Sequence, residues 1–158
     1  VRDVLALVAE PLSIVGDWPM SERASLAGDR VWFTGRVTDD ALIELHHRHL
    51  ALLAPLRFGA GSRRKLVAAM GLGLPVITTS EGARGLLVRD AEPDDAVLIA
   101  DTPAQMAEAV RRLRAEPDWA DEIAARAQHV VRDVYAASIY DQQITNLLAD
   151  YLPPRRSL

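Results

Sequence analysis

The stretch from Leu53 to Thr79, LAPLRFGAGSRRKLVAAMGLGLPVITT, limits most strongly what this chain of 158 residues can fold into. Residues 50–54 form an apolar run with the length of a buried strand, and residues 58–62 break that run with two glycines. A short apolar helix is expected next, and then a second buried strand. Because a strand, a glycine turn and a helix follow one another, the stretch predicts the ligand-binding carboxyl edge of an open parallel sheet.

The glycine turn and the first turn of the helix after it have the chemistry of an anion site. Backbone N–H groups at a helix start bind phosphate well, and three cations follow in a single turn. Ser62 is expected to cap this helix. The predicted phosphate-binding residues are Gly59, Ala60, Gly61, Ser62, Arg63, Arg64 and Lys65. The alternative is an ordinary strand-to-helix turn with solvated cations, and a Gly-x-Gly spacing alone leaves both interpretations open.

Strands and helices alternate along the rest of the chain, which predicts an α/β fold with an open, parallel, Rossmann-like sheet of about five strands. The strands are expected at 12–15, 31–34, 50–54, 76–78 and 97–100. Helices are expected at 1–9, 21–27, 39–47, 102–113 and 118–134, and a helical tail from Ser138. Ser21, Thr38 and Thr102 are the expected caps of three of them. We expect one domain over 1–152 and a frayed tail over 153–158.

Composition excludes several classes of protein. A net charge of -4 argues against general nucleic-acid binding, which needs a basic face. The absence of cysteine excludes a disulfide framework and a thiolate metal site. No apolar run approaches 18 residues and no signal peptide is evident, so we expect a cytoplasmic protein without a membrane span. The first residue is Val1 rather than methionine, as expected for a piece of a longer protein.

Metal and nucleophilic chemistry are poorly supported. His46 and His49 are three residues apart, but the helix is expected to end between them and no carboxylate completes a site. His129 is expected on the surface. There is no cysteine and no Gly-x-Ser-x-Gly nucleophile elbow. We therefore expect no metal, no cofactor and no catalytic residue within this chain.

The central stretch also resembles a known family, the donor-binding half of the group 1 glycosyltransferases, which are retaining enzymes of the GT-B fold. The resemblance covers nearly the whole chain and is most specific in its centre. The matching segments are 55–61, Lys65, 69–70, 73–79 and 82–86, with 12–16 and 31–37 upstream.

This resemblance implies a nucleoside diphosphate sugar as ligand, with Lys65 the best match among the phosphate-binding cations. It also implies that the donor pocket is lined by Gly16, Ala68, Glu81, Gly82 and Ala83. In this family an amino-terminal, acceptor-binding domain completes the enzyme and holds the usual catalytic histidine. That domain is the expected partner, in the same chain or in another.

One position departs from the family pattern. The family usually has a glutamate just before the Ala-Met pair, where it accepts hydrogen bonds from the ribose hydroxyls, and this chain has Ala68. Losing two such bonds weakens binding on the order of 100-fold or more. Two hypotheses therefore stand: the sugar-donor half of a glycosyltransferase, or a non-catalytic scaffold or partner-binding domain derived from one.

Overall fold

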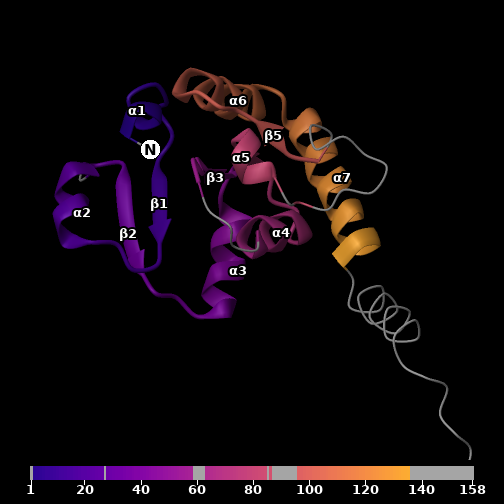
Figure 1. Ribbon diagram of the computed structural model, residues 1–158, viewed down its shortest axis with the longest axis horizontal. Coiled ribbons are helices and arrows are strands. Elements are labelled where there is room, and N and C mark those ends of the chain that lie inside the picture. Colours follow the sequence, from indigo (N-terminus) through magenta and orange to yellow (C-terminus); the bar gives the residue numbers. More distant parts are fainter. Residues whose placement is uncertain (1, 27, 59–62, 85, 87–95, 136–158) are drawn as a thin grey trace, which may run out of the picture.

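The computed structural model describes residues 2–26, 28–58, 63–84, 86 and 96–135 (Figure 1). Among these residues, strands and helices alternate as far as Ile99, and two longer helices follow. The helices are α1 Arg2–Leu5, α2 Met20–Leu26, α3 Asp39–Arg48, α4 Arg64–Gly71, α5 Ser80–Ala83, α6 Pro103–Ala115 and α7 Pro117–Tyr135. The strands are β1 Leu12–Val15, β2 Val31–Gly35, β3 Leu52–Ala54, β4 Val76–Thr78 and β5 Leu98–Ile99.

All the strand pairs that the described residues form are parallel, which confirms the expected α/β class. β1 pairs with β2 in register Leu12 to Val31, with an irregularity after Ile14. β3 pairs with β4, and β4 pairs with β5 on its other side. Among the described residues these ladders form two sheets, ordered β1-β2 and β3-β4-β5, instead of one continuous sheet of five strands.

The three-stranded sheet is buried on both faces. Val76 of β4 belongs to a cluster that contains Leu66 and Met70 of α4 and Ala127 of α7. The next residue, Ile77, belongs to a second cluster with residues of α1 and α6, among them Val4, Met106 and Leu113. Since neighbouring strand residues face opposite sides, α4 and α7 cover one face of this sheet and α1 and α6 cover the other.

The helix ends follow local chemistry that the sequence predicts well. Thr38 caps α3 by accepting a hydrogen bond from the Ala41 N–H at 3.3 Å. Thr102 and Gln105 form a full capping box at the start of α6. α4 ends in a Schellman motif, in which Gly73 has a φ of 76° and the Leu74 N–H bonds to the Ala69 carbonyl at 2.9 Å.

Two expected helix starts need correction, and one expected helix lies outside the description. The N-cap position of α4 is Arg63, not Ser62. Ser21 lies inside α2, which begins one residue earlier at Met20, so it does not cap that helix. The helix expected from Ser138 lies outside the described residues. Among the helices described, none is long and apolar enough to cross a membrane.

Candidate functional site: the carboxyl edge of the three-stranded sheet

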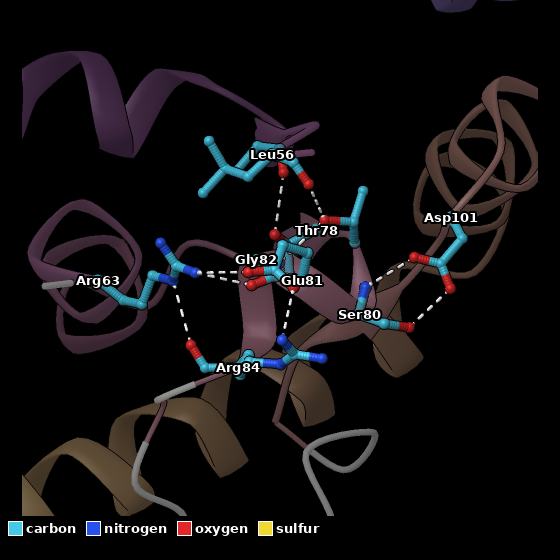
Figure 2. Close-up of polar contacts among 10 residues, drawn as sticks. Leu56, Arg63, Thr78, Ser80, Glu81, Gly82, Arg84 and Asp101 are labelled. Carbon is cyan, nitrogen blue, oxygen red and sulfur yellow. Dashed lines mark hydrogen bonds and ion pairs between the residues drawn. The ribbon is translucent and has the colours of Figure 1, made fainter. Parts of the chain in front are cut away.

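The short helix α5 directly follows β4. Hydrogen bonds hold it to residues that follow β3 and β5, the two strands beside β4 (Figure 2). The side chain of Thr79 occupies the N-cap position and accepts a hydrogen bond from the Gly82 N–H at 2.9 Å. The same hydroxyl donates to the carbonyl of Leu56, just beyond β3. Thr79 is buried, so this one side chain joins the residues after β3 to α5.

Position 82 has no room for a side chain, so it requires glycine. A Cβ at Gly82 would lie 2.0 Å from the hydroxyl oxygen of Thr78. That hydroxyl is itself fixed, because it donates to the carbonyl of Ala54 at 2.9 Å and Thr78 is fully buried. A side chain at position 82 would therefore displace either α5 or the hydrogen bond that links β4 to β3.

Asp101, which follows β5, holds the other side of α5. One carboxylate oxygen accepts from the Ser80 N–H at 2.8 Å, and the other accepts from the Ser80 hydroxyl at 2.6 Å (Figure 2). The hydrogen bond from the Ser80 side chain, followed by that from its backbone, lowers the pKa of Asp101 below the ordinary value. The two bonds favour the ionised form, so Asp101 is a fixed negative charge at this edge of the sheet.

Arg63 joins the start of α4 to α5. Its guanidinium donates from Nη2 to the carbonyl of Glu81 at 2.7 Å and from Nε to the carbonyl of Arg84 at 3.2 Å (Figure 2). The side chain is only 9% exposed. The Glu81 carboxylate lies 3.9 Å from Arg63 Nη2 and 3.2 Å from Arg84 Nη1. Arg63 therefore contributes a buried positive charge and also orients the backbone of α5.

The other two predicted cations differ from Arg63 in their exposure. Arg64 and Lys65 are solvent-exposed in the first turn of α4. Ala68 is also exposed, and it lies four residues after Arg64 and three after Lys65. Residues at these spacings are neighbours on a helix surface, so the three positions share one exposed face of α4.

The predicted site residues fall into four groups in the structure, of which Arg64, Lys65 and Ala68 on the exposed face of α4 are one. Arg63, Glu81 and Gly82 are brought together, and Ala83 is buried beside them in α5. The glycine turn 59–62 lies outside the described residues. Gly16 follows β1 in the other sheet, with a φ of 104° and its N–H bonded to the Gly35 carbonyl at 2.7 Å. Within the described ranges no hydrogen bond or ion pair connects Gly16 to α5.

Two groups that organise this edge, Thr79 and Asp101, are not among the residues predicted from the sequence. Both follow a predicted strand directly, Thr79 after β4 and Asp101 one residue after Ala100. The carboxyl ends of parallel strands meet at one edge of a sheet, where ligands bind. Polar residues immediately after consecutive strands were therefore the signal that could have identified them.

The histidines have local roles. His46 bonds through Nδ1 to the Leu42 carbonyl at 2.6 Å, and His49 bonds through Nε2 to the Ser13 hydroxyl at 2.8 Å. His129 is exposed and pairs with Asp133 at 2.9 Å. In the part of the chain that the structure describes, no three potential ligands gather into a group that could hold a metal.

Comparison with solved structures gives the same fold. Sucrose-phosphate synthase from Thermosynechococcus elongatus superposes with a TM-score of 0.74 and 22% identity, over 94% of this chain and 40% of that one. HepE from Anabaena, in its complex with UDP and glucose, gives a TM-score of 0.76 and 21% identity, over 94% and 43% of the two chains. HepE in complex with UDP-glucose gives a TM-score of 0.66 and 24% identity, over 94% of this chain and 43% of that one. The chain thus spans less than half the length of these structures.

Family comparison identifies the chain itself. No curated protein sequence matches it. The sequence pattern of the family described as "Glycosyl transferases group 1" matches residues 1–116, which include all five strands, the glycine turn, α4 and α5. That match extends over most of the 158 residues. The chain belongs to the group 1 glycosyltransferases.

Proposed function

We propose that this chain is the nucleotide-sugar-binding domain of a retaining glycosyltransferase, which transfers a sugar from a nucleoside diphosphate to an acceptor. The observation that carries the proposal is the arrangement of α4, whose exposed Arg64 and Lys65 lie in its first turn, next to the carboxyl edge of a parallel sheet. Family membership supports it, as do the HepE crystals that hold UDP or UDP-glucose.

The chemistry of such a site is electrostatic. The bond between the sugar and the diphosphate breaks with growing negative charge on the leaving phosphate, and N–H groups and cations stabilise that charge. In this proposal Arg64 and Lys65 act as solvent-facing cations, and the backbone groups of 59–62 complete the phosphate site. Arg63 acts chiefly by holding α5, where Glu81, Gly82 and Ala83 line the sugar side. Gly16 and Ala68 line the base and ribose sides.

A second domain is part of the proposal. The acceptor-binding half of the enzyme, in the same polypeptide or a separate one, would supply the acceptor and the catalytic histidine of the family. The chain alone is then expected to bind nucleotide without transferring sugar.

One observation favours a second candidate function. Ala68 presents a methyl group on the exposed face of α4, at the position where the family usually has a ribose-binding glutamate. A chain that binds no nucleotide would be a non-catalytic scaffold or partner-binding domain that kept the fold.

Calorimetric titration with nucleoside diphosphates and their sugars separates the two candidates. A donor domain binds at least one of them, and Lys65→Ala and Arg64→Ala each weaken that binding severalfold, since each removes a charge-assisted contact. Both residues are exposed, so the melting temperature should change little, with stability effects near 0.5 kcal/mol. Arg114→Ala, an exposed cation on α6, is the matched control and should bind as the parent does. Equal affinity in all four proteins would refute the phosphate site.

A further inference from the structure

The ends of β1 and β2 carry a pair of opposite charges that the proposed phosphate and sugar sites do not use. β1 and β2 are parallel neighbours, so both end at the same carboxyl edge of their sheet (Figure 1). Asp17 lies two residues after β1, and Arg36 directly follows β2. The Arg36 Nε donates to Asp17 Oδ2 at 2.6 Å. Because ligands of open parallel sheets bind outside this edge, the pair lies where a ligand would meet it.

The backbone before each charged residue holds the pair together. Gly16 precedes Asp17 and Gly35 precedes Arg36, and the two glycines have left-handed φ angles of 104° and 68°. Other residue types would be strained there. The Gly16 N–H donates to the Gly35 carbonyl at 2.7 Å, so the two strand ends form a backbone bridge. The ion pair is therefore built on a hydrogen-bonded turn of the chain rather than on two independent loops.

The same two glycines leave an open surface beside the pair. Apart from its own chain neighbours, a Cβ at Gly16 or at Gly35 would meet no heavy atom within 4 Å. The side chains of Asp17 and Arg36 are 69% and 86% exposed. A flat ring can therefore lie on the backbone of the two glycines, with one edge against the carboxylate and the guanidinium.

The pair offers its hydrogen-bonding groups in a defined order. The Asp17 carboxylate has two acceptor oxygens, and the Arg36 guanidinium has donors on Nη1 and Nη2 that the bond from Nε does not use. From Asp17 to Arg36 the order is thus two acceptors followed by two donors. Guanine has the complementary order along one edge, because its N2 amino group and N1–H are donors and its O6 and N7 are acceptors. A guanidinium bound to O6 and N7 is also the commonest specific contact of arginine with a base.

The other bases match this order less completely. Uracil has a single donor, N3–H, between two carbonyl acceptors, and adenine has a single amino donor between two ring acceptors. Cytosine comes nearest, with one donor followed by two acceptors. Each of these bases leaves at least one oxygen of Asp17 without a donor. A good bidentate contact discriminates between bases by roughly tenfold to a hundredfold, so guanine is the base that this pair favours.

We propose that Asp17 and Arg36 select a guanine base, so that the sugar donor is a guanosine diphosphate sugar. The inference rests on the proposed function, in which Gly16 lines the base side of the donor pocket. Asp17 accepts from the N1–H and the N2 amino group of the base, and Arg36 donates to O6 and N7. The base lies on the backbone of Gly16 and Gly35. Both charged residues act in binding, and they leave the transfer of the sugar to the rest of the enzyme.

Calorimetric titration of the protein with GDP and two of its analogues tests each contact separately. IDP lacks the N2 amino group that Asp17 binds, and 7-deaza-GDP lacks the N7 that Arg36 binds. We expect GDP to bind about tenfold more tightly than either analogue, and about tenfold or more tightly than UDP, CDP and ADP.

Two variants assign the contacts to their residues. Asp17→Asn replaces one acceptor by a donor, so it should bind GDP and IDP with nearly equal affinity and still bind 7-deaza-GDP less tightly than GDP. Arg36→Ala should remove the difference between GDP and 7-deaza-GDP and keep the difference between GDP and IDP. Both residues are exposed, so the melting temperature should change little. Glu108→Gln, at an exposed acid of α6 that pairs with Arg111 at 2.9 Å, is the matched control and should keep every preference of the parent.

The outcomes separate this inference from the proposed function. If UDP, CDP or ADP binds as tightly as GDP or more tightly, the guanine assignment is overturned while the nucleotide-binding domain stands. If both variants keep the full preference of the parent for GDP over IDP and 7-deaza-GDP, the assignment to Asp17 and Arg36 is overturned. If no nucleoside diphosphate binds at all, both the inference and the proposed function are overturned.

Discussion

At the scale of single residues, Ala68 is the most informative position on the exposed face of α4. It lies beside Arg64 and Lys65, and in the proposed donor site a longer acidic side chain at this position would reach the ribose. We predict that Ala68→Glu tightens nucleoside diphosphate binding by roughly 2–4 kcal/mol, less the cost of ordering, by adding two hydrogen bonds to the vicinal hydroxyls. Calorimetry with a ribonucleotide and its 2′-deoxy analogue measures this gain.

The deoxy ligand is the control for the Ala68 prediction. It lacks one hydroxyl, so its gain should be smaller. An unchanged dissociation constant, or an equal gain for both ligands, would show that position 68 does not face the ribose and would favour the non-catalytic scaffold.

Substitution of Gly82 tests how closely α5 is packed onto β4. A methyl group there would lie 2.0 Å from the Thr78 hydroxyl oxygen, so we predict that Gly82→Ala destabilises the protein by about 1–3 kcal/mol. Gly28→Ala is the matched control, because nothing lies within 4 Å of a Cβ at Gly28. Urea unfolding compares the two variants. If Gly82→Ala costs no more than Gly28→Ala, the close contact with Thr78 is not a constraint.

Asp101 makes stability depend on pH in a defined direction. The hydrogen bonds from Ser80 lower the pKa of Asp101 in the folded protein. The contribution of Asp101 to the free energy of unfolding is therefore fully present above the pKa of the unfolded chain, about 3.9, and is lost as the pH falls below that pKa. We predict that Asp101→Asn reduces the free energy of unfolding at pH 7, and that the difference from the parent shrinks toward pH 3. Urea unfolding at several pH values would contradict this if the difference stayed constant.

At the scale of secondary-structure elements, Arg63 makes the polar link between the start of α4 and α5. Arg63 bonds to the carbonyls of Glu81 and Arg84 while its own side chain is 9% exposed. We predict that Arg63→Ala costs about 1–3 kcal/mol of stability, because two carbonyls lose their donor. Arg63→Lys keeps the charge but not the fork of donors, so it should recover only part of the loss. Chemical denaturation, with Arg114→Ala as a control near zero, would refute the link if Arg63→Ala were equally mild.

Most elements could be predicted from the sequence because their signals are local. The capping box at Thr102 and the glycine end of α4 involve residues only a few positions apart. The division into two sheets could not be predicted in this way, because strand pairing depends on what lies beside each strand in space. The same holds for Arg63. The residues around Arg63 suggest a solvated cation. In the structure, however, Arg63 contacts α5 and Arg84, which lie 18 and 21 residues further along the chain.

The predicted phosphate site is a further case in which contacts between distant residues could not be predicted from the sequence. Three consecutive cations suggest one shared role, but the structure buries the side chain of Arg63 and exposes Arg64 and Lys65. Arg63 precedes the helix at its N-cap position and reaches the carbonyls of Glu81 and Arg84, whereas Arg64 and Lys65 lie on the exposed side of the first turn. The roles of Thr79 and Asp101 depend on strand ends that are far apart in sequence and become neighbours only in the sheet.

At the scale of the whole molecule, the proposed function requires that the exposed start of α4 binds the diphosphate of a nucleotide. Lys65 is the only lysine of the sequence, so an amine-reactive acetylating reagent modifies only Lys65 and the amino group of Val1. Mass spectrometry of the digested protein follows the two rates separately, and Val1 serves as the internal control. We expect UDP, or whichever nucleoside diphosphate binds in the calorimetric screen, to slow the acetylation of Lys65 about tenfold at nine-tenths occupancy and to leave Val1 unchanged. Acetylation of Lys65 at the same rate with and without every nucleoside diphosphate tested would contradict the proposed donor site.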